Sequence, residues 1–496
     1  MTGQRQLLRE RGICVVIPTY NNGGTISRVV SEVLEQCADV IVVNDGSTDD
    51  TGLLLHAIDG ITIVEYERNR GKGHALKAGF RKARAMGFAY AITLDADGQH
   101  YPADIALLLR ANCEHPGALI VGKRNLEGVE RSGGSKFANA FANFWFAVQT
   151  LHYLPDTQTG FRLYPLKKLY GLPLLTSRYE AELELLVMAS WHGVPLRSIP
   201  VSVYYPPQSE RVSHFRPALD FARISLLNCV LCLLAVVYAL PLGLLRLLLA
   251  AGRTAYCLLV FLFFSLFVFT PGVWLFVKTR RMTEQRRLML HRLIQLTARF
   301  VMQQHGIPGT TFACKGVEQA DFSRPHVIIC NHQSHLDLMC QLLLTPKIVF
   351  LTNDWVWHSP FFGFIVRSAE FCPVSEGIDV LMPRLRSLAE RGYSIAVYPE
   401  GTRSPHCRIA RFHRGAFHIA EQLGLDVLPM YLYGTGRVLP KGGLYLRKGP
   451  VCLEVGTAFS REQLQAMGDT LQQARTLRSH YAEHYQQMAN KIEQDV

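Results

Sequence analysis

Short apolar runs rich in β-branched residues alternate with longer amphipathic stretches from Ile13 to about Tyr205. Between the runs, the segments Thr25 to Gln36 and Gly73 to Met86 repeat apolar residues at helical spacing. This alternation is typical of an α/β domain built on a largely parallel sheet, so we expect that fold here. The predicted strands are ICVVIP, VIVVND, ITIVEY, YAITLD and ALIVG.

A second alternation of the same kind follows later in the chain. Its strand candidates are HVIIC, KIVFLT, YSIAVYP and LDVLPMYLYG, separated by helical stretches such as Val380 to Arg391. We therefore expect a second α/β domain. The tail from Arg461 to Gln494 has the composition of a polar helix, and we expect a solvated surface there.

Two apolar runs, Ile224 to Leu245 and Thr254 to Val277, separate these regions. Each is long enough to cross a hydrocarbon core of about 30 Å as a helix. The short connection that holds Arg246 and Arg253 predicts a helical hairpin. Pro241 leaves a re-entrant hairpin open as an alternative to a spanning pair. Either geometry returns the chain to the side from which it entered.

Basic residues follow the second apolar run, with Glu284 as the single acid among them. Positive charge beside a membrane segment favours the cytoplasmic side. We therefore predict an inner-membrane protein whose two catalytic domains both face the cytoplasm. The basic residues are Lys278, Arg280, Arg281, Arg286 and Arg287. The predicted boundaries are 1–220 and 281–460 for the two α/β domains, 221–280 for the membrane hairpin and 461–496 for the polar helix.

Composition narrows the function classes. Charged residues make up 19% of the chain and hydrophobic residues 49%, which is less charge than the roughly 25% of soluble domains. The net charge of +12 suits an anionic partner, but no basic stripe with interleaved aromatics or zinc-finger spacing is present, so nucleic acid is not expected. The 12 cysteines form no disulfide-like framework. No phosphate-binding G-x-x-x-x-G-K-[ST] loop occurs, which argues against a nucleotide-driven transporter.

Acidic residues end two of the N-terminal strands. Asp45 follows one strand in NDGS, and Asp95 and Asp97 follow another in DADGQ. Ligands of open α/β sheets bind at the carboxyl ends of the strands. Asp97 can there hold a divalent cation that bridges a diphosphate and neutralises a departing nucleotide.

Five strings in this region carry a family resemblance: VVIPTYNN, VNDGSTDDT, NRGKGHALKAGF, LDADGQH and TQTGFRLYP. They resemble family 2 glycosyltransferases of the dolichyl-phosphate-sugar synthase type, over about Ile13 to Tyr205. The resemblance implies a GT-A (Rossmann-like) fold, a nucleotide-sugar donor and a Mg²⁺ or Mn²⁺ cofactor. The implied nucleotide-sugar site consists of Pro18, Thr19, Tyr20, Asp45, Asp95 and Arg124, and the implied metal site of Asp97 and Gln99.

The roles of several residues in this domain stay open. Arg124 and Arg162 each suit a phosphate, although a salt bridge explains either one equally well. Asn22 stands where the family usually has an acid, which leaves donor recognition open. The polymerising Q-x-x-R-W motif is absent from the sequence, which favours single transfer. Glu182 and Glu184 are candidates for a base only by location, so no base is assigned.

A histidine and an aspartate follow the apolar strand HVIIC in the string Asn331 to Asp337. Acyl transfer to an alcohol needs a base, which His332 suits, and an acidic partner such as Asp337 fixes its tautomer. On an unbroken helix, two side chains five residues apart point about 140° away from each other, so His332 and Asp337 could not meet there. The pair must therefore straddle a loop and a helix start, with Ser334 as the N-cap.

The strand YSIAVYP runs into PEGTRS, and VLP follows later. With N-H-x-x-x-x-D, these strings resemble the 1-acylglycerol-3-phosphate acyltransferase family over about Leu288 to Leu453. The resemblance implies His332 and Asp337 as the catalytic pair and no cofactor. It also implies an acyl-acceptor site made of Glu400, Gly401, Thr402 and Arg403.

One departure concerns the acceptor. The family's middle block usually ends in an arginine that grips phosphate, whereas this chain has AEFCPVSEG. Arg411 and Arg414 are alternatives for the missing charge, with a solvated surface as the other explanation. His335 is expected to be a packing or surface residue and not a second base.

These observations predict a bifunctional transferase at the membrane. It would move a sugar from a nucleotide-sugar to a lipid or lipid-linked acceptor, and an acyl group from acyl-CoA or acyl-carrier protein to a lipid or glycolipid hydroxyl. The alternative is that one domain is active while the other is a lipid-binding or scaffold module.

Overall fold

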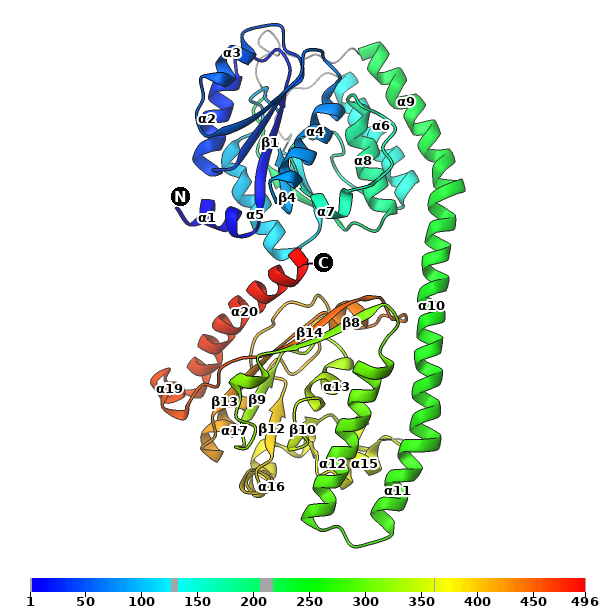
Figure 1. The fold of residues 1–496 in the computed structure, drawn as a ribbon, viewed down its shortest axis with the longest axis vertical. Coiled ribbons are helices and arrows are strands. Elements are labelled where there is room, and N and C mark those ends of the chain that lie inside the picture. Colours follow the sequence, from blue (N-terminus) through cyan, green and yellow to red (C-terminus); the bar gives the residue numbers. More distant parts are fainter. Residues whose placement is uncertain (1, 126–132, 206–216, 361, 496) are drawn as a thin grey trace. The chain divides into compact units, whose positions relative to one another are not determined.

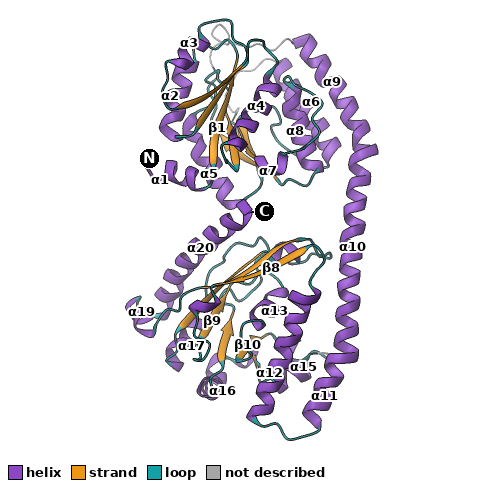
Figure 2. Ribbon diagram, viewed as in Figure 1, coloured by secondary structure: helices purple, strands orange, loops and turns teal. Residues whose placement is uncertain are grey.

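The computed structural model describes residues 2–125, 133–205, 217–360 and 362–495 (Figure 1). The chain divides into two compact units, Met1–Leu245 and Arg246–Val496. Each unit has its own seven-stranded sheet flanked by helices, as the colours of Figure 2 show. The predicted α/β class of both domains is confirmed.

The N-terminal sheet has the strand order β3-β2-β1-β4-β6-β5-β7. β6 runs antiparallel to β4 and β5, and the other neighbouring strands are parallel. The five predicted strands are present, whereas β6 and β7 were not predicted. The strands are β1 (Ile13–Thr19), β2 (Val40–Asn44), β3 (Ile61–Glu65), β4 (Tyr90–Thr93), β5 (Leu119–Arg124), β6 (Arg162–Pro165) and β7 (Leu196–Val201).

Strand β1 is buried on both faces, as an all-apolar central strand requires. Ile13, Val15 and Ile17 join one core cluster, and the alternating residues Cys14 and Val16 join another. The chain builds β2 and β3 on one side of β1 and returns to place β4 on the other. This reversal of strand order lies between β1 and β4, and ligands of such sheets bind at the carboxyl ends of the strands at that position.

Helices cover this sheet. Helix α4 packs on β1 and β2, and α5 packs on β5 and β7. The close approach of α4 depends on Gly79, where an added Cβ would meet a Val16 methyl at 2.4 Å. The helices are α1 (Thr2–Glu10), α2 (Ile26–Gln36), α3 (Thr51–His56), α4 (Lys72–Ala85), a 3₁₀ turn (Pro102–Asp104), α5 (Ile105–Glu114), α6 (Gly133–Thr150), α7 (Leu166–Leu169) and α8 (Glu180–Trp191).

The predicted hairpin differs from the structure. The helical segments follow one another without a turn, so Leu219–Lys278 forms one helix that is long and apolar enough to cross a membrane. The expected connection consists mostly of leucine, alanine and arginine, which are strong helix formers, and it contains no proline. The segments are α9 (Pro217–Leu234), a π-helix (Ala235–Ala239), α10 (Leu240–Phe263), a second π-helix (Phe264–Phe269) and α11 (Thr270–Lys278).

The two prolines of this helix explain the π-helical turns. Pro241 and Pro271 each lie two residues after a π-helix ends. Proline lacks an N–H donor and clashes with the carbonyl four residues earlier, and a wider turn moves that carbonyl away. The helix therefore continues through both prolines.

The C-terminal sheet has the order β11-β10-β12-β9-β13-β14-β8. All neighbours are parallel except β13 and β14. The four predicted strands are present, and β8, β11 and β14 were not predicted. The strands are β8 (Thr310–Lys315), β9 (Val327–Cys330), β10 (Ile348–Thr352), β11 (Cys372–Pro373), β12 (Ser394–Val397), β13 (Val427–Tyr433) and β14 (Gly449–Val455).

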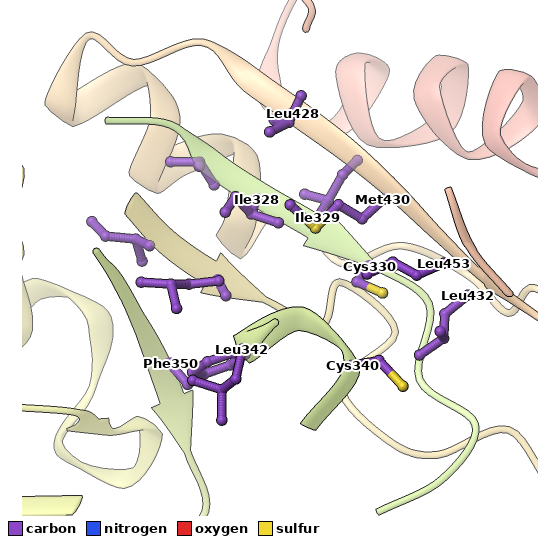
Figure 3. Packing of buried hydrophobic residues seen from close by; sticks show 14 of the residues in the cluster. Ile328, Ile329, Cys330, Cys340, Leu342, Phe350, Leu428, Met430, Leu432 and Leu453 are labelled. Atoms are coloured by element: carbon purple, nitrogen blue, oxygen red, sulfur yellow. The ribbon is translucent and has the colours of Figure 1, made fainter. Parts of the chain in front are cut away.

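The core of this unit lies between the sheet and its helices. Figure 3 shows Cys340 and Leu342 of α13 together with Ile328 and Cys330 of β9, and all four belong to one buried cluster. The helices are α12 (Glu284–Arg299) with a π-helical end (Phe300–His305), a 3₁₀ turn (Val317–Gln319), α13 (Leu336–Leu342), α14 (Asp354–Trp357), α15 (Gly363–Ser368), a 3₁₀ turn (Val374–Glu376), α16 (Ile378–Glu390), α17 (Gly415–Leu423), α18 (Thr435–Val438), α19 (Arg461–Ala466) and α20 (Thr470–Asp495).

The C-terminal tail is a correction to the expected solvated helix. Helix α20 packs against β13 and α17, and one of its faces belongs to the buried core (Figure 1). The buried positions recur at helical spacing, although few of them are strongly apolar. They are Ala474, Leu477, Tyr481, Tyr485, Met488, Ala489 and Ile492.

Candidate active sites

The loops after β1 and β2 lie at the N-terminal site and are joined by hydrogen bonds. The backbone N–H of Asn22 donates to Thr51 Oγ1 at 2.9 Å, and that of Asn21 donates to Ser47 Oγ at 3.0 Å. The Asn22 amide also donates to Thr19 Oγ1 and to the Tyr20 carbonyl. Asn22, which departs from the family pattern, therefore holds the predicted Pro18-Thr19-Tyr20 segment through hydrogen bonds.

Asp45 lies at the end of β2 and is buried. Its two carboxylate oxygens accept the backbone N–H groups of Arg70 and Gly71, each at 2.8 Å. Burial raises the pKa of Asp45, and these two hydrogen bonds oppose that shift. Asp45 therefore ties the loop that enters α4 to the edge of the sheet.

Lys72 was not singled out by sequence reasoning, yet it lies at the centre of this site. Its Nζ is 2.7 Å from Asp95 Oδ1 and 2.9 Å from Glu182 Oε2. Burial alone would raise the pKa of Asp95, but the charge and hydrogen bond of Lys72 outweigh it and hold that pKa below its usual value. Gly160 lies against Asp95, since a Cβ there would meet Asp95 Oδ2 at 2.3 Å.

Asp97 is the carboxylate best placed to hold a cation. Burial, and next the charge of Asp95, raise the pKa of Asp97 to about 6. Its Oδ1 accepts the Gln99 backbone N–H at 3.0 Å. A divalent cation favours oxygen ligands and would offset the repulsion between the two carboxylates, so these residues fit the predicted Mg²⁺ or Mn²⁺. Among the described residues, no group of three or more His, Cys, Asp or Glu side chains is arranged as a metal site.

The two arginines have different environments. Arg124 binds Asp156 through two nitrogens, Nε at 2.7 Å and Nη2 at 2.9 Å. Arg162 is fully buried and donates to the carbonyls of Thr157 and Glu182. Arg162 therefore has a structural environment, whereas Arg124 stays at the edge of a cavity.

Glu182 and Glu184 also have different environments. Glu184 accepts the backbone N–H groups of Leu175 and Thr176 at 2.6 and 2.8 Å and is fully buried. Glu182 instead contacts Lys72, whose ammonium also contacts Asp95. Of the two location-based candidates, only Glu182 lies beside the carboxylate cluster.

A cavity of about 870 Å³ lies beside Arg124. Basic and amide side chains line it together with exposed aromatic residues of α6 and the following loop. Its lining includes Lys123, Arg124, Lys136, Asn139, Asn143, Phe144 and Tyr153. The cavity combines charge complementary to a phosphate with apolar surface.

The C-terminal site lies where β9 and β12 end side by side. His332 Nδ1 and Asp337 Oδ2 are 2.8 Å apart, and the same oxygen accepts the backbone N–H groups of Gln333 and Ser334. His332 lies in the loop after β9 and Asp337 in the first turn of α13, as the spacing argument predicted. Because a carboxylate only accepts, Nδ1 carries the proton and Nε2 is the free base.

The helix start differs in one detail from the expectation. His335, not Ser334, occupies the N-cap position of α13. Ser334 Oγ accepts the Leu336 N–H and donates to the Leu439 carbonyl. His335 packs edge-on against Trp355, in agreement with the packing role predicted for it.

The imidazole of His332 is held by further groups. Tyr398 stacks on it with ring centroids 4.1 Å apart. The buried Glu400 accepts the His332 backbone N–H and the Ala410 N–H, each at 2.9 Å. In the structure Glu400 therefore contacts the catalytic loop itself.

The rest of the predicted acceptor segment turns outward. Gly401 has φ +70°, a left-handed conformation suited to glycine. Thr402 is exposed, and Arg403 is half-buried. Burial first, and then the charge of Arg403, lower the pKa of His335.

Helix α20 supplies contacts to both neighbours of His332. Tyr481 Oη accepts the Asn331 N–H at 2.9 Å and lies 2.7 Å from Asn331 Oδ1. Gln333 Nε2 donates to Tyr485 Oη at 2.7 Å. Tail composition alone does not indicate these contacts.

We expect the substitution Tyr481→Phe to loosen the loop that holds His332. It leaves the buried Asn331 N–H without an acceptor, which costs about 1–3 kcal/mol and corresponds to roughly 5- to 150-fold faster local exchange. Hydrogen-exchange mass spectrometry of peptides covering 327–337 measures this change. The exposed Tyr445→Phe is the matched control. Unchanged exchange at 327–337 would contradict the assigned contact.

Comparison with known proteins finds a family match for each of the two domains. Residues 14–168 match the model of glycosyl transferase family 2, and residues 311–433 match the acyltransferase family model. A UDP-N-acetylglucosamine–dolichyl-phosphate N-acetylglucosaminyltransferase of Methanococcus voltae is 27% identical over 224 residues, covering 41% of this chain and 89% of that protein.

The C-terminal unit has its own relatives. A chloroplastic 1-acyl-sn-glycerol-3-phosphate acyltransferase of Arabidopsis thaliana is 33% identical over 123 residues, covering 24% of this chain and 34% of that protein. The chain thus spans about a third of the length of this relative. The crystal structure of the 1-acyl-sn-glycerophosphate acyltransferase of Thermotoga maritima aligns with a TM-score of 0.42 and 21% identity, over 50% of this chain and 98% of that one.

The folds and sites define a transferase with two enzyme units. The chain joins a domain that matches glycosyl transferase family 2 to a domain that matches the acyltransferase family, and its relatives include 1-acyl-sn-glycerol-3-phosphate acyltransferases.

Proposed function

We propose that both units are active on lipid substrates. The N-terminal unit transfers a sugar from a nucleotide-sugar to a lipid or lipid-linked acceptor. The C-terminal unit transfers an acyl group from acyl-CoA or acyl-carrier protein to a hydroxyl of a lipid or glycolipid. The observation that carries the proposal is the His332–Asp337 pair at 2.8 Å in a chain whose other sheet holds Asp45, Asp95 and Asp97 at its edge.

Acyl transfer follows from the tautomer of His332. Nε2 accepts the proton of the acceptor hydroxyl while that oxygen attacks the thioester carbonyl. The C–S bond then breaks, and the departing thiolate takes the proton back from Nε2 and leaves as the thiol. Asp337 holds the ring and stabilises the imidazolium that forms. Arg403 is proposed to bind an anionic group of the acceptor beside this base.

In sugar transfer, Asp97 with Gln99 would hold Mg²⁺ or Mn²⁺, which neutralises the diphosphate of the departing nucleotide. Lys72 adds a second positive charge at the same edge. Asp45 and the braced Pro18-Thr19-Tyr20 segment would contact the nucleotide.

The cavity beside Arg124 supports a lipid acceptor. Lys123 and Lys136 suit a phosphate, and α6 exposes apolar side chains next to them. The exposed residues Phe137, Phe144 and Val148 recur at helical spacing and suit a lipid chain. A lipid phosphate acceptor is already an anion, so sugar transfer to it requires no strong base.

Localisation at the inner membrane is part of the proposal. The helix Leu219–Lys278 supplies exposed apolar surface. Nucleotide-sugars and acyl thioesters are both cytoplasmic donors, so both units are proposed to face the cytoplasm. A helix of 60 residues is about 90 Å long, some three times the hydrocarbon thickness. Under this proposal the helix lies in or along the membrane without a single crossing that would separate the units.

Lipid labelling tests the whole proposal. Membranes containing the full chain are incubated with radiolabelled nucleotide-sugars and acyl thioesters, and lipid products are identified by mass spectrometry. We expect sugar-labelled and acyl-labelled lipids that are absent from membranes lacking the chain. Label from only one donor class, across a broad donor panel, would favour one active domain and a scaffold role for the other.

A further inference from the structure

A second cavity lies in the C-terminal unit, between α20 and the segment before α17. It has a volume of about 340 Å³ and is separate from the His332–Asp337 pair. Three arginines and one hydroxyl line it together with three apolar residues, and none of the lining residues is acidic. They are Arg411, Phe412, Leu471, Ala474, Arg475, Arg478 and Ser479.

No acidic side chain in the described part of the chain forms an ion pair with the arginines of this cavity. The guanidinium groups of Arg411 and Arg475 form no hydrogen bond with any described residue. Arg478 donates only to the carbonyls of Ile409 and Ala410. Like charges that converge without a partner repel one another, and an anion between them removes that cost.

The cavity is connected to the catalytic loop. Arg478 Nη2 donates to the Ile409 carbonyl at 3.1 Å, and the next residue, Ala410, donates its N–H to Glu400 at 2.9 Å. The other oxygen of Glu400 accepts the N–H of His332. The wall of the pocket and the segment that holds His332 are therefore joined through Glu400.

We propose that this arginine pocket binds a phosphate group of a substrate of the acyltransferase unit. Guanidinium groups match phosphate geometry and bind it through paired hydrogen bonds. The pocket exceeds the needs of a bare ion and falls in the lower range of small-molecule sites. The phosphate belongs either to the nucleotide end of coenzyme A or to the head group of a phospholipid. The proposal rests on the acyl-transfer function proposed above.

Direct binding to the full chain tests the pocket. The two probes are adenosine 3′,5′-bisphosphate and phosphatidic acid in phosphatidylcholine vesicles, with pure phosphatidylcholine vesicles as the blank. We expect at least one probe to bind. The double variant Arg411→Gln/Arg475→Gln should weaken that binding at least about tenfold, consistent with the loss of two charge-assisted contacts.

Arg386→Gln is the matched control, because it removes the same charge from an exposed arginine of α16 outside the pocket. Binding by the bisphosphate assigns the pocket to the thioester donor, and binding by phosphatidic acid assigns it to a lipid head group. Failure of both probes to bind, or equal weakening by Arg386→Gln, overturns the proposal.

Kinetics separate this proposal from the proposed function. The double variant keeps His332 and Asp337, so we expect acyl transfer with a raised KM for the substrate that carries the phosphate and an unchanged kcat. If the unmodified chain transfers acyl groups but binds neither probe, the phosphate-pocket proposal is wrong and the proposed function stands. If the chain binds a probe but transfers no acyl group, the proposed function is wrong and the pocket proposal stands.

Discussion

Replacing His332 by alanine is expected to lower acyl transfer by at least about a hundredfold and to leave sugar transfer unchanged. A positioned general base contributes roughly 10²–10⁴-fold, and His332 Nε2 is the base that the hydrogen bond to Asp337 leaves free. Tyr398 and Glu400 hold the ring and backbone of His332 but offer no replacement for its lone pair. Acyl-chain incorporation from a labelled thioester into lipid, at saturating donor, measures the loss.

Two variants make this test specific. His358→Ala removes an exposed imidazole of the same unit and should leave acyl transfer intact. Asp337→Asn keeps the shape of the partner but replaces an acceptor with an amide, so it should also slow acyl transfer strongly by favouring the wrong tautomer. Normal acyl transfer by His332→Ala would show that the base lies elsewhere.

The sequence predicts best what depends on neighbouring residues. Asp45, Asp95 and His332 each follow a buried β-branched strand, and the carboxyl ends of parallel strands meet at one edge of a sheet. The geometry of the His332–Asp337 pair follows in the same way from helix rotation over five residues. These parts of both sites could be placed before any coordinates.

Contacts between distant segments could not be placed in this way. Lys72 reaches Glu182 across more than a hundred residues, and no local pattern signals that pairing. Tyr481 contacts Asn331 over a similar separation from a helix whose composition is polar. The antiparallel strand β6 has only four residues, too few for a period-2 pattern to indicate a strand.

The membrane segment shows a different limit. Hydropathy located the apolar residues correctly, but the turn between Leu245 and Thr254 was assumed from two arginines. Arginine is a good helix former, and its long side chain can extend toward a polar surface. The connection therefore remains helical.

Replacing Asp97 by alanine is expected to lower sugar transfer by at least about a hundredfold while acyl transfer continues at its normal rate. The departing nucleotide carries a diphosphate, and stabilising that developing charge is worth roughly 10²–10³-fold per essential group. Asp97 is the carboxylate available to a cation, because Lys72 already occupies Asp95 Oδ1. A chelator should reproduce the loss in the unmodified chain, and added Mg²⁺ or Mn²⁺ should restore it.

The variant and the chelator together decide whether the cation acts through Asp97. Asp59→Ala, which removes an exposed carboxylate before the amino end of β3, should leave both reactions unchanged. If Asp97→Ala retained metal-dependent sugar transfer, the cation would bind elsewhere. If sugar transfer survived both the variant and the chelator, Lys72 would be the main positive charge on the diphosphate. Lys72→Met should then cause the larger loss, because the remaining carboxylates would repel the donor without compensation.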